Sequence, residues 1–190
     1  MNYFNIKKSA LILMDHQVGI TTWGSTTPIA LLRRNVLMLA AFAKGTNLPV
    51  LLTSNHETNR HVQGPLIPEL EKTLPQAFAT RIKRTSAINA WDDEAFVKAC
   101  RKLGRKNLVI AGVTTDISVV PAALGALKAG YRVKVVCDAC GSSNQIAETM
   151  AWRRMERAGA ELTSTNAIVA ELAKDWESPA GVVALSLWSA

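Results

Sequence analysis

The feature that most limits the possible folds of this chain is its alternation between short apolar runs and longer segments of helical periodicity. The short runs lie at 10–14, 49–53, 78–83, 107–111, 131–137 and 161–163. Several are continuously apolar, which is typical of parallel strands that are buried on both faces. Helical segments separate the runs, and such an alternation predicts a parallel sheet with helices on both faces.

The helical segments carry start and stop signals. In the first of them, Thr27 is a candidate N-cap, Pro28 suits the first turn, and Gly45 is a candidate end. Further helices are expected over 92–103, 118–129, 143–158 and 167–174. Because no repeat, low-complexity segment or linker interrupts the pattern, residues 1–190 are expected to form a single α/β domain.

The composition narrows the possible classes of protein. Hydrophobic residues make up 48% of the chain, which is typical of a globular protein, and no apolar run is long enough to span a bilayer. The run at 10–14 is also too short for the core of a signal peptide. Three cysteines, an odd number, argue against a disulfide framework. We therefore expect a soluble, cytoplasmic protein with no membrane partner.

The formal net charge of +7 is compatible with a nucleic-acid partner. The basic residues are scattered over helices and connections, however, and no aromatic side chains are interleaved with them for base stacking. We therefore expect no nucleic-acid partner. A solvated basic surface and the attraction of small anionic substrates both fit this charge.

Polar residues follow three of the predicted strands at the points where these end. Asp15 follows "ALILM", Lys83 and Arg84 follow "FATRI", and Ser118 lies just beyond "NLVIAG". In open parallel sheets, ligands bind beyond the carboxyl ends of the strands. A carboxylate, a cation and a nucleophile-type side chain are the groups that acyl transfer needs. Helix caps and ordinary first-turn polar residues explain the same positions without any catalytic role.

Longer stretches resemble a known family. The matching segments are "ALILMDHQVGI", "GPLIPEL", "INAWDDEAFVKAC", "VIAGVTTDISVVPAALGALKAGYRVKVVCDACGS" and "MAWRRMERAGAELTST". Together they are similar to the isochorismatase-like cysteine hydrolases, especially the YcaC-like branch. The resemblance implies a three-layer α/β/α fold whose six-stranded parallel sheet has the order 3-2-1-4-5-6. It also implies a small-molecule substrate, no cofactor and a homo-oligomer, with an octamer as one candidate.

The resemblance assigns roles to individual residues. Asp15 matches the catalytic aspartate of a D-x-Q motif that includes Gln17. Arg84 matches the basic member of the site, with Lys83 as an alternative one residue away. Asn89 and Trp91 match a segment of the substrate pocket, although Trp91 could equally belong to the core.

The resemblance also assigns roles in the stretch "GVTTDIS". Val113–Thr114 falls where the family has a cis peptide bond, which would turn the N–H groups of Thr114 and Ser118 toward an oxyanion. Ser118 occupies the position of the family's nucleophilic cysteine.

This serine is the main departure from the family pattern. A cysteine thiol has a pKa near 8.5, which a helix N-terminus lowers further, whereas a serine hydroxyl is far less acidic. Ser118 is either the natural residue of a weakened or repurposed site or a substitution that disables the enzyme, and we favour the former. The expected function is hydrolysis of a small amide or related C–N bond. The alternatives are a non-catalytic small-molecule binder and an enol-ether hydrolase of the isochorismatase type.

Other chemically active residues have simpler explanations. His16 should point away from Asp15, because neighbouring side chains of a strand face opposite ways. His56, Glu57 and His61 lie where related nicotinamidases bind a metal, but Ser54 replaces the expected aspartate, so we expect no metal.

Two further segments contain a cysteine pair and an apolar run. Cys137 and Cys140 form a C-x-x-C at the end of a strand rather than at the start of a helix, and we expect structural thiols. The apolar segment 181–188 is expected to form a short helix or arm that contacts another subunit.

Overall fold

The computed structural model describes residues 3–58 and 62–189 and contains a six-stranded sheet with the order β3-β2-β1-β4-β5-β6. All neighbouring strands are parallel. The sheet therefore has the predicted topology. The strands are β1 Ser9–Met14, β2 Val50–Asn55, β3 Ile82–Arg84, β4 Asn107–Gly112, β5 Arg132–Val136 and β6 Glu161–Thr163.

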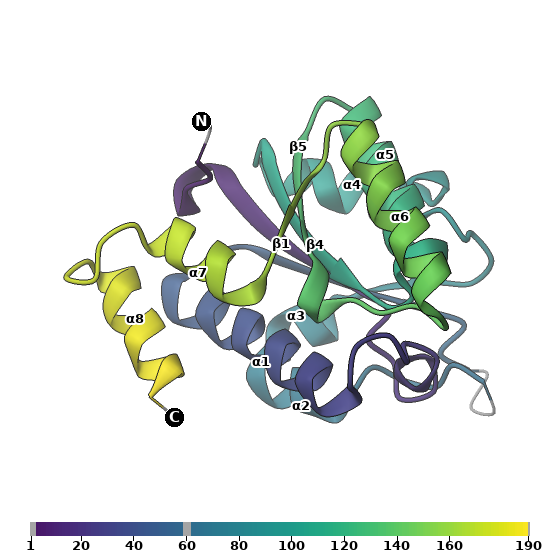
Figure 1. Ribbon diagram of the computed structural model, residues 1–190, viewed down its shortest axis with the longest axis horizontal. Helices are drawn as coiled ribbons and strands as arrows, with labels where there is room; N and C mark the ends of the chain where they lie inside the picture. Colours follow the sequence, from purple (N-terminus) through teal and green to yellow (C-terminus); the bar gives the residue numbers. More distant parts are fainter. Residues whose placement is uncertain (1–2, 59–61, 190) are drawn as a thin grey trace.

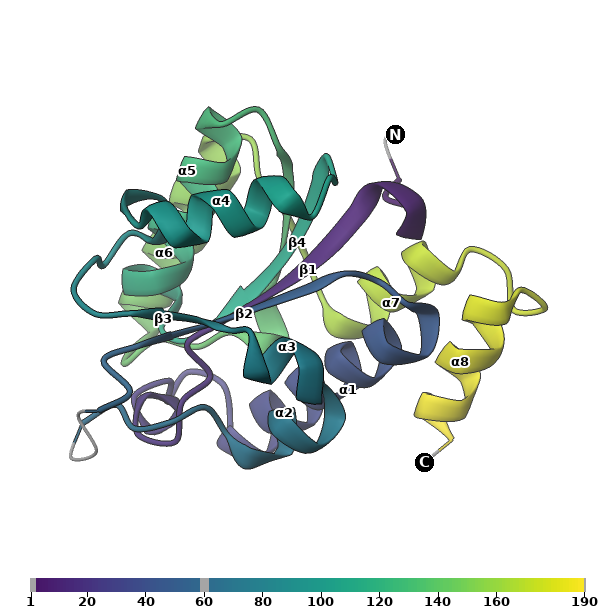
Figure 2. The same cartoon turned by 180° about the vertical axis from the view of Figure 1, so that it is seen from behind.

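Helices cover both faces of the sheet and give the three predicted layers (Figures 1 and 2). One layer contains α1, α2, α3, α7 and α8, and the other contains α4, α5 and α6. No helix in the described part of the chain has the length and hydropathy that crossing a membrane requires. The bounds are α1 Ile29–Thr46, α2 Pro68–Thr73, α3 Pro75–Ala79, α4 Glu94–Lys102, α5 Val120–Lys128, α6 Gln145–Arg157, α7 Thr165–Ala173 and α8 Pro179–Trp188.

The centre of the molecule is the β1–β4 pair. Every residue of both strands is buried, which explains why both are continuously apolar. The two strands run in register from Ser9 opposite Asn107 to Met14 opposite Gly112. Both strands therefore end at the same level, and the residues that follow them meet at the carboxyl edge of the sheet.

Three local predictions were wrong. The strand expected at 78–83 is divided between α3 and the short β3, because Pro75 at the first position of α3 favours a helical turn that includes Phe78. The first helix does not end at Gly45 but continues to Thr46, and Asn47 terminates it in the left-handed conformation with φ 54°. Its N-cap is Pro28 rather than Thr27.

The helix expected to begin at Ser118 begins two residues later. Thr115–Val119 forms a single π-helical turn, and α5 starts at Val120 with Pro121 in its first turn. Turns of this kind are often found at functional sites. The C-terminal apolar segment forms α8, which packs against α1 and α7 and leaves Val182 and Leu185 exposed.

Candidate functional site

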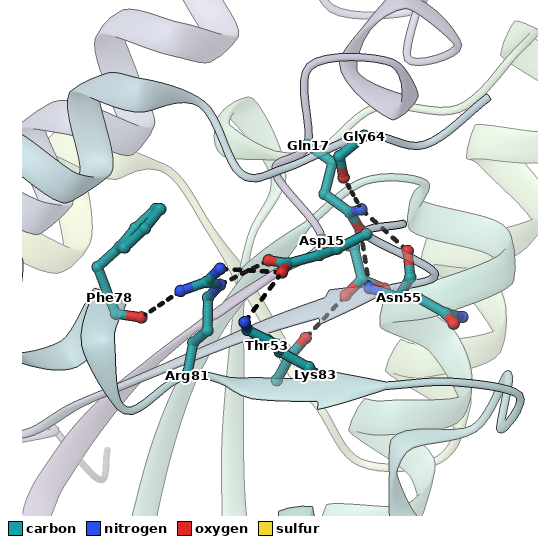
Figure 3. Close-up of polar contacts among 9 residues, drawn as sticks. Asp15, Gln17, Thr53, Asn55, Gly64, Phe78, Arg81 and Lys83 are labelled. Carbon is teal, nitrogen blue, oxygen red and sulfur yellow. Dashed lines mark hydrogen bonds and ion pairs between the residues drawn. The ribbon is translucent and has the colours of Figure 1, made fainter. Parts of the chain in front are cut away.

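Asp15 lies at the carboxyl end of β1, where the chain turns sharply. Its φ of 55° is in the left-handed region, which aspartate adopts more readily than most residues. The turn is held by hydrogen bonds from the Asp15 N–H to the Thr53 carbonyl at 3.0 Å and from the Gln17 N–H to the Asp15 carbonyl at 2.7 Å. The Thr53 hydroxyl donates to Asp15 Oδ1 at 2.8 Å (Figure 3). The carboxylate is thereby held at the edge of the sheet.

Arg84 is the basic residue that contacts Asp15. Its Nη2 donates to Asp15 Oδ2 in an ion pair whose side chains are almost completely buried. The other end of the guanidinium donates to the carbonyls of Ala87 at 2.7 Å and Ile88 at 3.0 Å. Lys83 is not part of this pair, since its side chain is 60% exposed and its Nζ lies 3.7 Å from Glu57.

Gln17 uses its side-chain amide to join the end of β2 to the loop that contains Gly64, beside Asp15 (Figure 3). Its Nε2 donates to the carbonyls of Asn55 and Gly64, and its Oε1 accepts the Asn55 N–H at 2.8 Å. These bonds occupy both ends of the amide. Gln17 therefore supports the rim of the site instead of presenting a free amide to a ligand.

The segment after β4 carries Ser118. The Val113–Thr114 peptide bond is cis, as the resemblance implied. Within the π-helical turn, the Ser118 N–H donates to the Thr114 carbonyl at 2.9 Å, so this N–H group already has an acceptor. The turn is also held from the β5–α6 side, because the Thr115 N–H donates to the Gly141 carbonyl at 3.0 Å.

A buried side-chain bond holds the same turn. The Thr115 hydroxyl donates to Glu148 Oε1 on α6 at 3.0 Å, and both side chains are buried. The sequence offered no indication of this contact. The π-helical turn is thus attached to both the β5–α6 connection and α6.

Asp15, Thr114 and Ser118 line one cavity of about 320 Å³ at the carboxyl edge of the sheet. The structure therefore places the residues that end β1 and follow β4 around the same space. The other lining residues are Ile20, Trp23, Asn55, His56, Gln63, Ser86, Ile88 and Ile117. A larger cavity of about 720 Å³ lies at the opposite edge, where it is lined by residues that precede β1 and β2, and it contains none of the predicted site residues.

Asn89 and Trp91 lie outside the cavity, contrary to expectation. The Trp91 indole donates to the Ala122 carbonyl at 2.7 Å and packs against α5, where a Cβ added to Gly125 would lie 2.2 Å from the ring. Asn89 Oδ1 accepts the Trp91 N–H at 3.1 Å. Both residues support the chain behind the cavity wall, and the preceding Ile88 lines the cavity instead.

His16 is packed in the core. It is completely buried, and its Nε2 lies 3.1 Å from the Ala139 carbonyl. Burial lowers the pKa of His16 to about 4, although the bond to Ala139 and the charge of Asp15 act in the opposite direction. The imidazole is therefore neutral at neutral pH.

The remaining candidates show no reactive arrangement. Burial raises the pKa of Cys137 to about 12 and that of Cys140 well above its usual value, as expected for structural thiols. Glu57 binds Arg81 through two hydrogen bonds of 2.5 and 2.9 Å. His61 lies outside the described residues. Within the described ranges, no three His, Cys, Asp or Glu side chains are placed to hold a metal ion.

Comparison with known proteins identifies the family of this chain. The isochorismatase domain model matches residues 9–167 of this chain. The probable hydrolase YcaC of Escherichia coli is 41% identical over 170 residues, which cover 90% of this chain and 80% of YcaC.

Two solved structures show the same likeness. The E. coli YcaC gene product, described as an octameric hydrolase of unknown specificity, superimposes with a TM-score of 0.93 at 40% identity, over 100% of this chain and 90% of its own. YcaC from Pseudomonas aeruginosa, solved with hexane-2,5-diol and covalent acrylamide, gives a TM-score of 0.90 at 39% identity, over 96% and 90% of the two chains. The chain therefore belongs to the isochorismatase-like hydrolase family and, within it, to the YcaC-like branch.

Proposed function

We propose that this chain hydrolyses a small carboxamide or a related C–N bond at the cavity between Asp15 and Ser118. The observation that carries the proposal is that Asp15, ion-paired with the buried Arg84, lines the same cavity as Ser118. A base next to a nucleophile-type side chain is the arrangement that acyl transfer requires. The hydrolase descriptions of the YcaC relatives support the same class of reaction.

The residues would act in the following order. Asp15 accepts the proton of the nucleophile at position 118, which attacks the amide carbonyl carbon. The carbonyl oxygen becomes an oxyanion that a backbone N–H stabilises. The C–N bond then breaks, and the leaving nitrogen takes the proton from Asp15. Asp15 then deprotonates a water molecule, whose oxygen attacks the acyl carbon. The C–O bond to Ser118, or the C–S bond in Ser118→Cys, breaks, and the released nucleophile takes the proton back from Asp15.

We assign the oxyanion donor to the Thr114 N–H. The resemblance suggested both Thr114 and Ser118, but the Ser118 N–H donates to the Thr114 carbonyl inside the turn. Thr114 itself lines the cavity. Arg84 acts indirectly, by neutralising the charge of the buried Asp15 carboxylate.

Ser118 makes the activity of this form low. An aspartate is a poor base for a serine hydroxyl. Among the described lining residues the one histidine is His56, which follows β2, whereas Ser118 follows β4. P. aeruginosa YcaC was solved with covalent acrylamide, a small primary amide, which is compatible with a substrate of this kind. The alternative is a non-catalytic binder that keeps the cavity without the thiol.

The test is release of ammonia from a panel of small primary carboxamides by the parent protein, Ser118→Cys and Ser118→Ala. We expect Ser118→Cys to be the most active form, and Ser118→Ala to release no ammonia above background. Addition of Asp15→Asn should abolish the activity of Ser118→Cys. If Ser118→Cys releases no ammonia from any amide, the amide-hydrolase proposal is wrong and the non-catalytic alternative is preferred.

The remaining expectations follow from the relatives. We propose that the chain forms a homo-oligomer, which the octameric YcaC of E. coli supports, and that its partner is a small molecule rather than a nucleic acid or membrane. We also propose a cytoplasmic location, no cofactor and a single domain over residues 1–190.

A further inference from the structure

The wall of the catalytic cavity is largely apolar. Four large apolar side chains line it: Ile20, Trp23, Ile88 and Ile117. Three of these side chains are substantially exposed: Trp23 is 42% exposed, Ile88 62% and Ile117 49%. Contact with an apolar group would remove part of this surface from water, which is favourable in proportion to the area covered. The wall therefore favours a ligand with an apolar body.

The charges near the cavity also favour an uncharged ligand over an anionic one. The charged side chain that lines its floor is the Asp15 carboxylate. The guanidinium of Arg84 is fully buried and directs its donors to Asp15 and to the carbonyls of Ala87 and Ile88. Among the described residues, no lysine or arginine lines the cavity. A carboxylate on the ligand would find no lysine or arginine among the described lining residues to offset the loss of its hydration.

The volume of the cavity and its neutral polar groups limit the ligand further. A volume of about 320 Å³ is at the small end of the range of about 300–1,000 Å³ for ligand sites. Asn55, Gln63 and Ser86 contribute the neutral polar part of the lining. The cavity can thus hold a small molecule with one neutral polar end and one apolar end.

From these features we infer that the site selects uncharged primary carboxamides with a compact apolar body over amides that carry a carboxylate. This inference rests on the proposed function, and it specifies the substrate class.

Two amides of matched shape test the inference. In 4-methylpentanamide an isopropyl group stands where succinamate has a carboxylate, and the remaining atoms are the same. Calorimetric titration of the parent protein, which retains Ser118, should show that 4-methylpentanamide binds at least about 30-fold more tightly, as expected for burial of a branched aliphatic group. Equal or tighter binding of succinamate would overturn the inference, as would failure of both amides to bind at millimolar concentration.

A charge placed on the wall should change this preference. Ile88→Lys adds a cation at an exposed position of the lining. We expect it to shift the ratio of the two affinities, succinamate over 4-methylpentanamide, by about tenfold in favour of succinamate. Ile146→Lys is the matched control, because Ile146 is an exposed isoleucine on α6 that does not line the cavity. Ile146→Lys should keep this affinity ratio within about twofold of the value for the parent protein. A similar change in both variants would show that the wall does not determine selectivity.

The outcomes separate this inference from the proposed function. If Ser118→Cys releases ammonia from succinamate but not from 4-methylpentanamide, the hydrolase proposal is supported and the substrate class is wrong. If the parent protein binds 4-methylpentanamide selectively but Ser118→Cys hydrolyses neither amide, the substrate class is supported and the hydrolase proposal is wrong.

Discussion

Removal of the buried cation is expected to be among the most damaging single changes in this protein. Arg84→Met leaves the Asp15 carboxylate buried without its ion partner, and it also removes the donors to the Ala87 and Ile88 carbonyls. Breaking a buried ion pair on one side costs about 3–5 kcal/mol. We therefore expect the free energy of unfolding to fall by at least about 3 kcal/mol, a large fraction of the stability of a typical domain.

A double-mutant cycle provides the assay. Urea unfolding at neutral pH is followed for the parent protein, Arg84→Met, Asp15→Asn and the double variant. Because the double variant leaves neither charge unpaired, the two losses should not add, and we expect a coupling energy of at least about 2 kcal/mol. The double variant also keeps the test informative if Arg84→Met does not fold.

An exposed ion pair of the same chain is the control. Arg33 lies 3.4 Å from Glu69, and both side chains are about 40% exposed. Arg33→Met should therefore cost less than about 1 kcal/mol. The reasoning is refuted if Arg84→Met costs no more than Arg33→Met, or if the Asp15 and Arg84 losses add to within about 0.5 kcal/mol.

Three further predictions concern pH, packing and assembly. Because burial lowers the pKa of His16 from 6.5 to about 4, the unfolded state binds more protons between these values, so stability should fall by roughly 2–3 kcal/mol from pH ~7 to pH ~4.5. Urea unfolding at both pH values should show a smaller fall for His16→Gln; an unchanged fall would contradict this. Gly125→Ala should lower the free energy of unfolding by about 1–3 kcal/mol, because its Cβ would meet Trp91, and a stability gain in urea would refute that contact. Val182→Glu should reduce the particle mass in light scattering, and an unchanged mass would place subunit contacts away from α8.

The central strands and the residues that end them could be predicted from the sequence because burial acts on every residue of β1 and β4. Both strands read as continuous apolar runs, and parallel pairing brings their carboxyl ends together. The approach of Asp15 to the segment containing Ser118 follows from this topology. The resemblance supplied Arg84, and the structure distinguishes it from Lys83 by burial.

The cavity wall could not be predicted in the same way. Trp23 and Ile88 come from irregular connections, where no periodicity shows which side chains face each other, and both are substantially exposed. The contact between Thr115 and Glu148 could not be predicted either. The two residues are far apart in the chain, and nothing in the sequence distinguishes Glu148 from other polar residues of α6. Trp91 did have a local indication, because Gly125 inside α5 disfavours the helix and marks a close approach of another side chain.

The most direct test of the central claim, that the site activates a nucleophile at position 118, is the rate of acrylamide alkylation of Ser118→Cys, with the modified residue identified by peptide mass spectrometry. The native cysteines are internal references, since burial raises the pKa of Cys100 and Cys137 to about 12 and that of Cys140 well above its usual value. At about pH 7 the thiol introduced at position 118 should react at least about 100-fold faster than these three, and added Asp15→Asn should slow it at least about tenfold. Alkylation at position 118 that is no faster than at the native cysteines, or that does not depend on Asp15, would contradict the account.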